Sequence, residues 1–230
     1  MNEYRLENSP QILVKVRRSA QARRMTLRVS ALDGRVTLSL PRFASDHQAQ
    51  QFLKEHESWL QDKVGSQSPP ARPGIGSTIL FEGRETPILS GSGAAPLADG
   101  SAIFVPGPPE KVPVTLAAYL RVLARQRLAT ACDRYALQVG KPYSGLSLRD
   151  TRSRWGSCSA AGRLMFSWRL IMAPKEVLDY VAAHEVAHLV EMNHSHAYWA
   201  VLEGLFPNHK PARAWLKTHG ARLHAYRFND

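Results

Sequence analysis

The sequence predicts an α+β protein with two parts. The N-terminal part (residues 1–108) is β-rich and antiparallel with one helix, and the C-terminal part (residues 109–230) has a hairpin followed by helices. Three observations lead to this class. Short segments rich in β-branched residues occupy the first third, segments with helical spacing of apolar residues fill the second half, and stretches rich in Gly and Pro separate them. The PGPPEKVP stretch at 106–113 marks the predicted boundary.

The first third is predicted to hold three short strands and one helix. The strands lie at 12–17, 25–29 and 35–40. Asp33 and Gly34 separate the second strand from the third and predict a hairpin, because Gly accepts a positive φ. Ser45 and Asp46 are N-cap candidates for a helix over about 46–63. Residues 65–76 are rich in Gly, Pro and Ser and predict a loop.

The middle of the chain predicts weak strands and then a long helix. The strands lie at 78–81, 86–89 and 102–105. A helix over about 113–139 follows, with leucines at positions 116, 120, 123, 128 and 137, and Gly140 is its natural end. The composition of the chain excludes a membrane-spanning protein. No apolar run approaches the roughly 20 residues needed to span a bilayer.

The last third predicts the elements that carry the candidate site. A strand at 146–152 precedes a hairpin whose turn is Ser159–Gly162. Pro174 suits the first turn of a helix that runs through about 191. A short helix near 196–205 and a last one over about 209–226 complete the chain.

The formal net charge of +11 is the main departure from ordinary composition. Many of the cations fall in the first strands, at Lys15, Arg17, Arg18, Arg23, Arg24 and Arg28. Such a basic surface attracts nucleic acid, nucleotides or acidic peptides, and a solvated face without a partner is an equally good interpretation. The N-terminus lacks the pattern of a secretory signal, so we expect cytoplasmic localisation. Oligomeric state is not predicted by the sequence.

The segment His184–His188 has the form H-E-x-x-H. On a helix, residues four apart project from one face, so two imidazoles can bind one zinc ion. Glu185 then lies where a general base can take a proton from water without ligating the metal. The two cysteines, Cys132 and Cys158, cannot form a four-thiolate site. We therefore predict a zinc site held by histidines.

A third ligand is expected, because a catalytic zinc takes three protein ligands and keeps one position open. His194 follows His188 by six residues, which is the metzincin ligand spacing. That pattern has Gly midway where this chain has Glu191, so we predict a left-handed turn at Asn193 instead. His196 is the competing ligand and Glu203 a more distant one.

These residues, read with several neighbouring segments, resemble the YgjP-like metallopeptidase family. The segments are RWGSC (154–158), FSWRL (166–170), AP (173–174), VLDYV (177–181), HEVAHL (184–189), NHS (193–195) and YW (198–199). Ser167 stands where the family usually has Asn. The resemblance implies a zincin-like catalytic core with His184, His188 and His194 as ligands. It also implies a more distant similarity to SprT-like proteases, which act on proteins attached to DNA.

Our first hypothesis is a zinc metallopeptidase acting on peptide or protein substrates. Arg154 is a candidate for binding a substrate carboxylate or phosphate, and Arg154, Ser195 or Tyr198 could supply an oxyanion donor. Asp179 or Glu191 could support a ligand histidine. Trp168 is expected in the core.

Two alternatives stay open. One is a metal-dependent phosphohydrolase that acts on nucleotides. The other is a nucleic-acid-binding protein with a structural zinc, closed by a fourth ligand such as His196.

Overall fold

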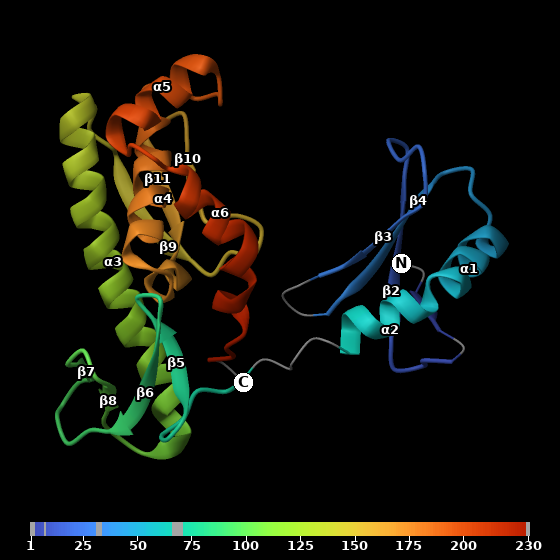
Figure 1. The fold of residues 1–230 in the computed structure, drawn as a ribbon, viewed down its shortest axis with the longest axis horizontal. Helices are drawn as coiled ribbons and strands as arrows, with labels where there is room; N and C mark the ends of the chain where they lie inside the picture. Colours follow the sequence, from blue (N-terminus) through green and yellow to red (C-terminus); the bar gives the residue numbers. More distant parts are fainter. Residues whose placement is uncertain (1–2, 7, 31–33, 66–70, 229–230) are drawn as a thin grey trace. The chain divides into compact units, whose positions relative to one another are not determined.

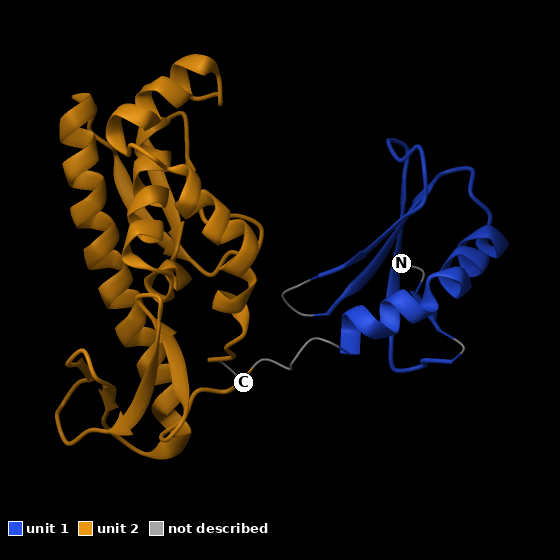
Figure 2. Ribbon diagram, viewed as in Figure 1, with its two compact units in different colours: residues 1–70 blue, residues 71–230 orange. Residues whose placement is uncertain are grey.

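The computed structural model describes residues 3–6, 8–30, 34–65 and 71–228. The chain forms two compact units, residues 1–70 and residues 71–230 (Figure 2). The division predicted at 108/109 falls inside the second unit. The reason is that Ile79, Ile88 and Ile103, from the strands before residue 108, are fully buried in the same hydrophobic core as the helices after it.

The first unit contains a four-stranded sheet in the order β1-β2-β4-β3 (Figure 1). The strands are β1 (Glu3–Arg5), β2 (Leu13–Ser19), β3 (Thr26–Val29) and β4 (Val36–Pro41). The predicted antiparallel pair of β3 and β4 is confirmed, although Asp33 of its turn lies outside the described residues. The expectation of a purely antiparallel sheet is wrong, since β2 and β4 are parallel. Strand β3 is not a neighbour of β2 in the sheet, because β4 lies between them.

Two helices cover one face of this sheet where the sequence predicted a single helix. They are α1 (Asp46–Glu55) and α2 (Glu57–Gly65). Ser45 caps α1 as predicted and forms a capping box with Gln48. The helix breaks at His56, whose ring Nδ1–H donates to the carbonyl of Phe52 at 2.9 Å. The two helices bury Leu53 and Leu60 against the sheet.

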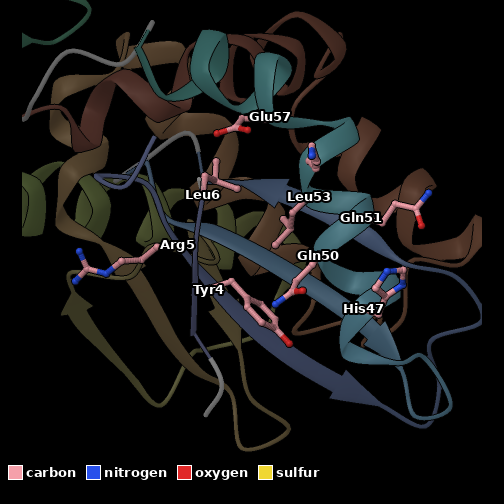
Figure 3. Close-up of a pocket in the computed structure, with 9 residues that line it drawn as sticks. Tyr4, Arg5, Leu6, His47, Gln50, Gln51, Leu53 and Glu57 are labelled. Carbon is pink, nitrogen blue, oxygen red and sulfur yellow. The ribbon is translucent and has the colours of Figure 1, made fainter. Parts of the chain in front are cut away.

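A cavity of about 380 Å³ lies in the first unit between β1 and α1 (Figure 3). Its lining residues are Tyr4, Arg5, Leu6, His47, Gln50, Gln51, Leu53, Lys54 and Glu57. The side chains are mixed in charge, and none belongs to the group of potential metal ligands that the described residues contain. That group lies in the second unit.

The second unit begins with a small sheet in the order β5-β6-β8-β7 and a long helix. The strands are β5 (Thr78–Phe81), β6 (Arg84–Ser90), β7 (Leu97–Ala98) and β8 (Ile103–Val105). A 3-10 turn at Pro109–Lys111 leads into α3 (Val112–Val139), which ends at Gly140 with φ 63° as predicted. Leu120 of α3 is fully buried, whereas Leu137 is 84% exposed because it faces away from the core.

A second sheet, in the order β10-β11-β9, forms the frame beside the site. The strands are β9 (Gly145–Arg149), β10 (Gly156–Cys158) and β11 (Arg163–Ser167). The predicted β10–β11 hairpin is confirmed, and Gly162 takes φ 70° in its turn. Strand β10 lies at an edge of the sheet. A 3-10 segment (Trp168–Met172) follows, and Trp168 is 1% exposed, as expected for a core residue.

Three helices complete the second unit: α4 (Lys175–Ala187), α5 (His196–Leu205) and α6 (Lys210–His219). Helix α4 contacts α3, α5, α6 and β10, so it occupies the centre of the unit (Figure 1). It ends four residues earlier than predicted, because tight turns replace it: Leu189 N–H donates to Val186 and Val190 N–H to Ala187. Helix α6 also ends earlier, in a 3-10 segment (Gly220–His224). Among the helices of the described residues, none is both long and apolar enough to cross a membrane.

Candidate metal centre

Three histidines converge beside the C-terminal end of α4. His184 lies on the last turn of α4, His188 is its C-cap residue, and His194 lies in the loop before α5. One ring nitrogen of each lies within 4.8 Å of the other two. The Nε2 atoms of His184 and His194 are 3.2 Å apart. Within the described ranges this is the single group of three or more side chains suited to a metal ion.

Hydrogen bonds determine which nitrogen of two of these rings is available. The Nδ1 of His188 lies 3.0 Å from the carbonyl oxygen of Glu191, which can only accept, so this nitrogen carries the proton. The hydroxyl of Tyr198 donates to the carbonyl of His184 at 3.1 Å and therefore accepts from His184 Nδ1–H at 2.7 Å. Both rings thus keep their proton on Nδ1 and have a lone pair on Nε2.

Tyr198 does not lie where a substrate contact or an oxyanion donor would have to be. Its side chain is fully buried, and its hydroxyl is occupied by His184. Burial also raises the pKa of Tyr198, which keeps the phenol neutral. The residue therefore orients a histidine. Ser195, the other candidate from this loop, accepts from Tyr198 N–H at 3.3 Å and is the N-cap of α5.

The side-chain carboxylates expected to support the histidines make no hydrogen bond to them within the described structure. Asp179 accepts from Arg134 at 2.7 Å and from the Tyr135 hydroxyl at 2.8 Å. Glu191 supports His188 through its backbone carbonyl, which any residue could provide. The support of the two rings is therefore uncharged.

The loop reaches His194 without the predicted left-handed residue at Asn193. In the described part of the chain, the non-glycine residues with positive φ are Glu82 and Asn208. Instead, Ser195 N–H donates to the carbonyl of Asn193 at 2.7 Å, which closes a three-residue turn centred on His194. The tight turns after Ala187 supply the rest of the reversal that a glycine would otherwise provide.

The two competing ligands lie outside the cluster. His196 begins α5 with an exposed side chain and is not part of the three-histidine group. The carboxylate of Glu203 contacts His209 Nδ1 at 2.8 Å and accepts from Asn208 N–H. The four-ligand arrangement with His196, which a structural zinc would need, is absent from the described residues.

Glu185 is 5% exposed and packs against strand β10. Burial raises its pKa to about 8, and the positive charge of Arg154 opposes that shift. The contact depends on Gly156, because a Cβ there would lie 2.5 Å from Glu185 Oε1 and 2.6 Å from its Cγ. No spacing rule in the sequence links this glycine to a glutamate on a later helix.

Two arginines lie near the histidine cluster. Arg154 is exposed, and its charge acts on Glu185. Arg213 of α6 lies over the ring of Trp199, 5.2 Å from its centroid. Burial, with smaller contributions from the charges of neighbouring histidines and Arg213, lowers the pKa of His184 to about 3. No sequence pattern indicates Arg213 as a site residue, because it reaches the site through helix packing. The thiol of Cys158 has a pKa raised by burial, which agrees with an unactivated cysteine.

Comparison with known proteins places this geometry in a family. The family model for the YgjP-like metallopeptidase domain matches residues 23–219. Among solved structures, the metallopeptidase zymogen of Pyrococcus abyssi abylysin is 18% identical, with a TM-score of 0.37 over 40% of this chain and 95% of that chain. No curated protein matches significantly. The chain belongs to the YgjP-like family and carries its metallopeptidase domain, so it is a metal-dependent hydrolase of the peptidase class.

Proposed function

We propose that this protein is a zinc peptidase in which His184, His188 and His194 bind one zinc ion and Glu185 is the general base. The observation that carries the proposal is the convergence of the ring nitrogens. In a tetrahedral site with Zn–N bonds of 2.0–2.1 Å, two ligand nitrogens are about 3.3 Å apart. The Nε2 atoms of His184 and His194 are separated by 3.2 Å, which fits such a site.

The donor set also favours zinc. Three neutral imidazoles suit zinc better than calcium or magnesium, which prefer oxygen ligands. Three protein ligands leave the fourth position open, as a catalytic site requires. When bound there, zinc would supply Lewis acidity that lowers the pKa of water and polarises a substrate carbonyl.

The chain's own residues supply the remaining functions. Glu185, whose pKa the charge of a bound zinc ion would lower, accepts a proton from the attacking water and returns it to the leaving amine. Its packing against Gly156 holds the carboxylate in one orientation. Arg154 binds a substrate carboxylate, since it is exposed and its charge reaches Glu185. Strand β10 is an edge strand, so an extended peptide can add to it beside Glu185.

Elemental analysis of the full chain tests the ligand set. The wild type should contain about one zinc per chain, and His194→Ala should contain far less. His196→Ala is the matched control, because this histidine is two residues away and outside the cluster, and it should keep its zinc. A wild type without metal after zinc is supplied would contradict the proposal. Loss of zinc in His196→Ala but not in His194→Ala would identify His196 as the third ligand.

Activity measurements test the base and the substrate class. The wild type is screened against a quenched-fluorescent peptide library and against nucleoside triphosphates. We expect peptide cleavage that Glu185→Gln abolishes while its zinc content stays unchanged, because glutamine keeps the shape and loses the proton acceptor. Cleavage by Glu185→Gln at the wild-type rate would exclude Glu185 as the base. Turnover of nucleotides without peptide cleavage would favour a phosphohydrolase.

A further inference from the structure

The face of the N-terminal sheet that α1 and α2 do not cover has a defined set of side chains. Strand register assigns residues to it: Lys15 pairs with Thr37 and Arg17 with Ser39, while Arg28 also pairs with Thr37. The alternate residues face the other way, and Val14 and Leu38 among them are fully buried. The outer sheet face therefore includes Glu3, Arg5, Leu13, Lys15, Arg17, Thr26, Arg28, Thr37 and Ser39.

This outer sheet face is basic and its charges are mostly unpaired. Arg5, Arg17 and Arg28 are exposed, and none has an ion pair with any residue that the structure describes. Lys15 lies 3.8 Å from Glu3, the one carboxylate among the nine residues. Four cations against one carboxylate give the face a clear excess of positive charge.

The cations are spaced over the face and are not clustered at one point. Lys15 and Arg28 stand on β2 and β3 with β4 between them, which separates them by about 10 Å at the usual strand spacing. Arg17 stands two residues along β2 from Lys15, about 7 Å away. Thr26, Thr37 and Ser39 fill the space between them with hydroxyl groups. The arrangement can contact several negative charges of one extended partner at the same time.

We propose that the outer sheet face binds the phosphodiester backbone of nucleic acid. Arginine, lysine and hydroxyl side chains are the usual donors to phosphate oxygens. The face has no aromatic residue on which a base could stack, so binding should be independent of sequence. An acidic protein surface fits less well, because stable protein interfaces depend on aromatic or other apolar anchors and this face offers only Leu13.

The charge of the whole chain supports the same partner. The first unit has 11 Lys and Arg against 7 Asp and Glu, and the second has 19 against 12. Both units therefore carry a net positive charge. A polyanion would be attracted by both units before it contacts the outer sheet face.

Fluorescence anisotropy of the full chain with labelled oligonucleotides tests the proposal. The probes are single-stranded DNA, the same sequence as RNA, and the corresponding duplex, at several salt concentrations. The test variant is Lys15→Thr/Arg17→Thr/Arg28→Thr, in which threonine keeps the strand propensity. The control variant, Lys111→Gln/Lys141→Gln/Lys217→Gln, removes the same charge from exposed positions of the second unit.

We expect salt-dependent binding by the wild type and affinity at least about tenfold lower in the test variant. The loss of three phosphate contacts should also reduce the slope of log K against log salt by about 2 for single strands and about 2.7 for duplex. The control variant should stay within about twofold of the wild type. The comparison of probes shows whether single strands or duplex are preferred.

Three results would overturn the proposal: no binding by the wild type at low salt, equal losses in the test and control variants, or binding to anionic vesicles without binding to nucleic acid. A misfolded test variant would be recognised by its circular dichroism, and Lys15→Arg/Arg17→Lys/Arg28→Lys, which keeps every charge, should then retain binding. The proposal does not depend on the peptidase, since His194→Ala should bind nucleic acid like the wild type.

Discussion

Replacement of Tyr198 by phenylalanine should weaken zinc binding. The change removes one oxygen atom and keeps the ring, which is fully buried. Two hydrogen bonds disappear, the 2.7 Å bond from His184 Nδ1–H and the 3.1 Å bond to the His184 carbonyl. The His184 ring then loses the hydrogen bonds that hold its tautomer and direct Nε2 toward the other histidines.

The expected loss in affinity follows from the role of such supporting groups. Removal of a hydrogen-bond partner of a ligating histidine commonly lowers metal affinity by about 10- to 100-fold. That range corresponds to about 1.4 to 2.7 kcal/mol of binding free energy. We expect the upper half of it, because the Tyr198 hydroxyl contacts both the ring and the backbone of the same residue.

Competition with a chromophoric chelator measures the zinc affinity of Tyr198→Phe at neutral pH. Tyr180→Phe is the matched control, since its ring lies 5.8 Å from the His184 ring and its hydroxyl makes no hydrogen bond to that histidine within the described structure. Equal affinities in Tyr198→Phe and the wild type would refute the assigned role. Equal losses in both variants would show a general effect of packing.

Three further perturbations have expected outcomes. Gly156→Ala should lower peptidase activity about 100-fold at unchanged zinc content, because its Cβ would displace the Glu185 carboxylate by about 1 Å. Gly145→Ala is the control and should be active, because a Cβ at Gly145 meets open space. A fully active Gly156→Ala would contradict the proposed contact with Glu185. Burial and the charge of Arg169 lower the pKa of His224 to about 4, so the unfolded chain binds a proton near pH 6.5 that the folded chain does not bind. Stability should therefore fall by about 2 kcal/mol between about pH 7.5 and pH 5, and urea unfolding should show that His224→Phe loses this component. Leu120→Ala should cost about 2–5 kcal/mol of unfolding free energy in the same assay, since Leu120 is fully buried; a cost below about 1 kcal/mol would mean that the core collapses around the cavity.

Local patterns predicted those features that depend on neighbouring residues in the chain. The N-cap of α1 at Ser45, the end of α3 at Gly140 and the β10–β11 hairpin all follow from short-range rules, and the sequence predicts each at its position. The position of His184 and His188 on one side of α4 follows from helical periodicity. These elements needed no knowledge of the rest of the fold.

Features that depend on contacts between distant segments were missed. The parallel pairing of β2 with β4 depends on where β3 returns, which the strand sequences do not specify. The expected carboxylate support of the histidines was wrong, because the orientation of α5 places the Tyr198 hydroxyl at His184 and Asp179 is engaged by Arg134. In each case, a sequence pattern identifies a residue type that could fill a role, and packing decides which residue fills it.

The uncharged support of the histidines has a consequence for the charge of the candidate centre. A tyrosine hydroxyl and a backbone carbonyl hold His184 and His188, so neither adds the negative charge that a supporting carboxylate would. Arg154 and Arg213 both add positive charge nearby. Glu185 is then the carboxylate that offsets a bound cation, and its burial against Gly156 keeps it close. If the proposed zinc site is correct, we expect a centre with this balance to favour anionic groups in its substrate, in line with the proposed role of Arg154.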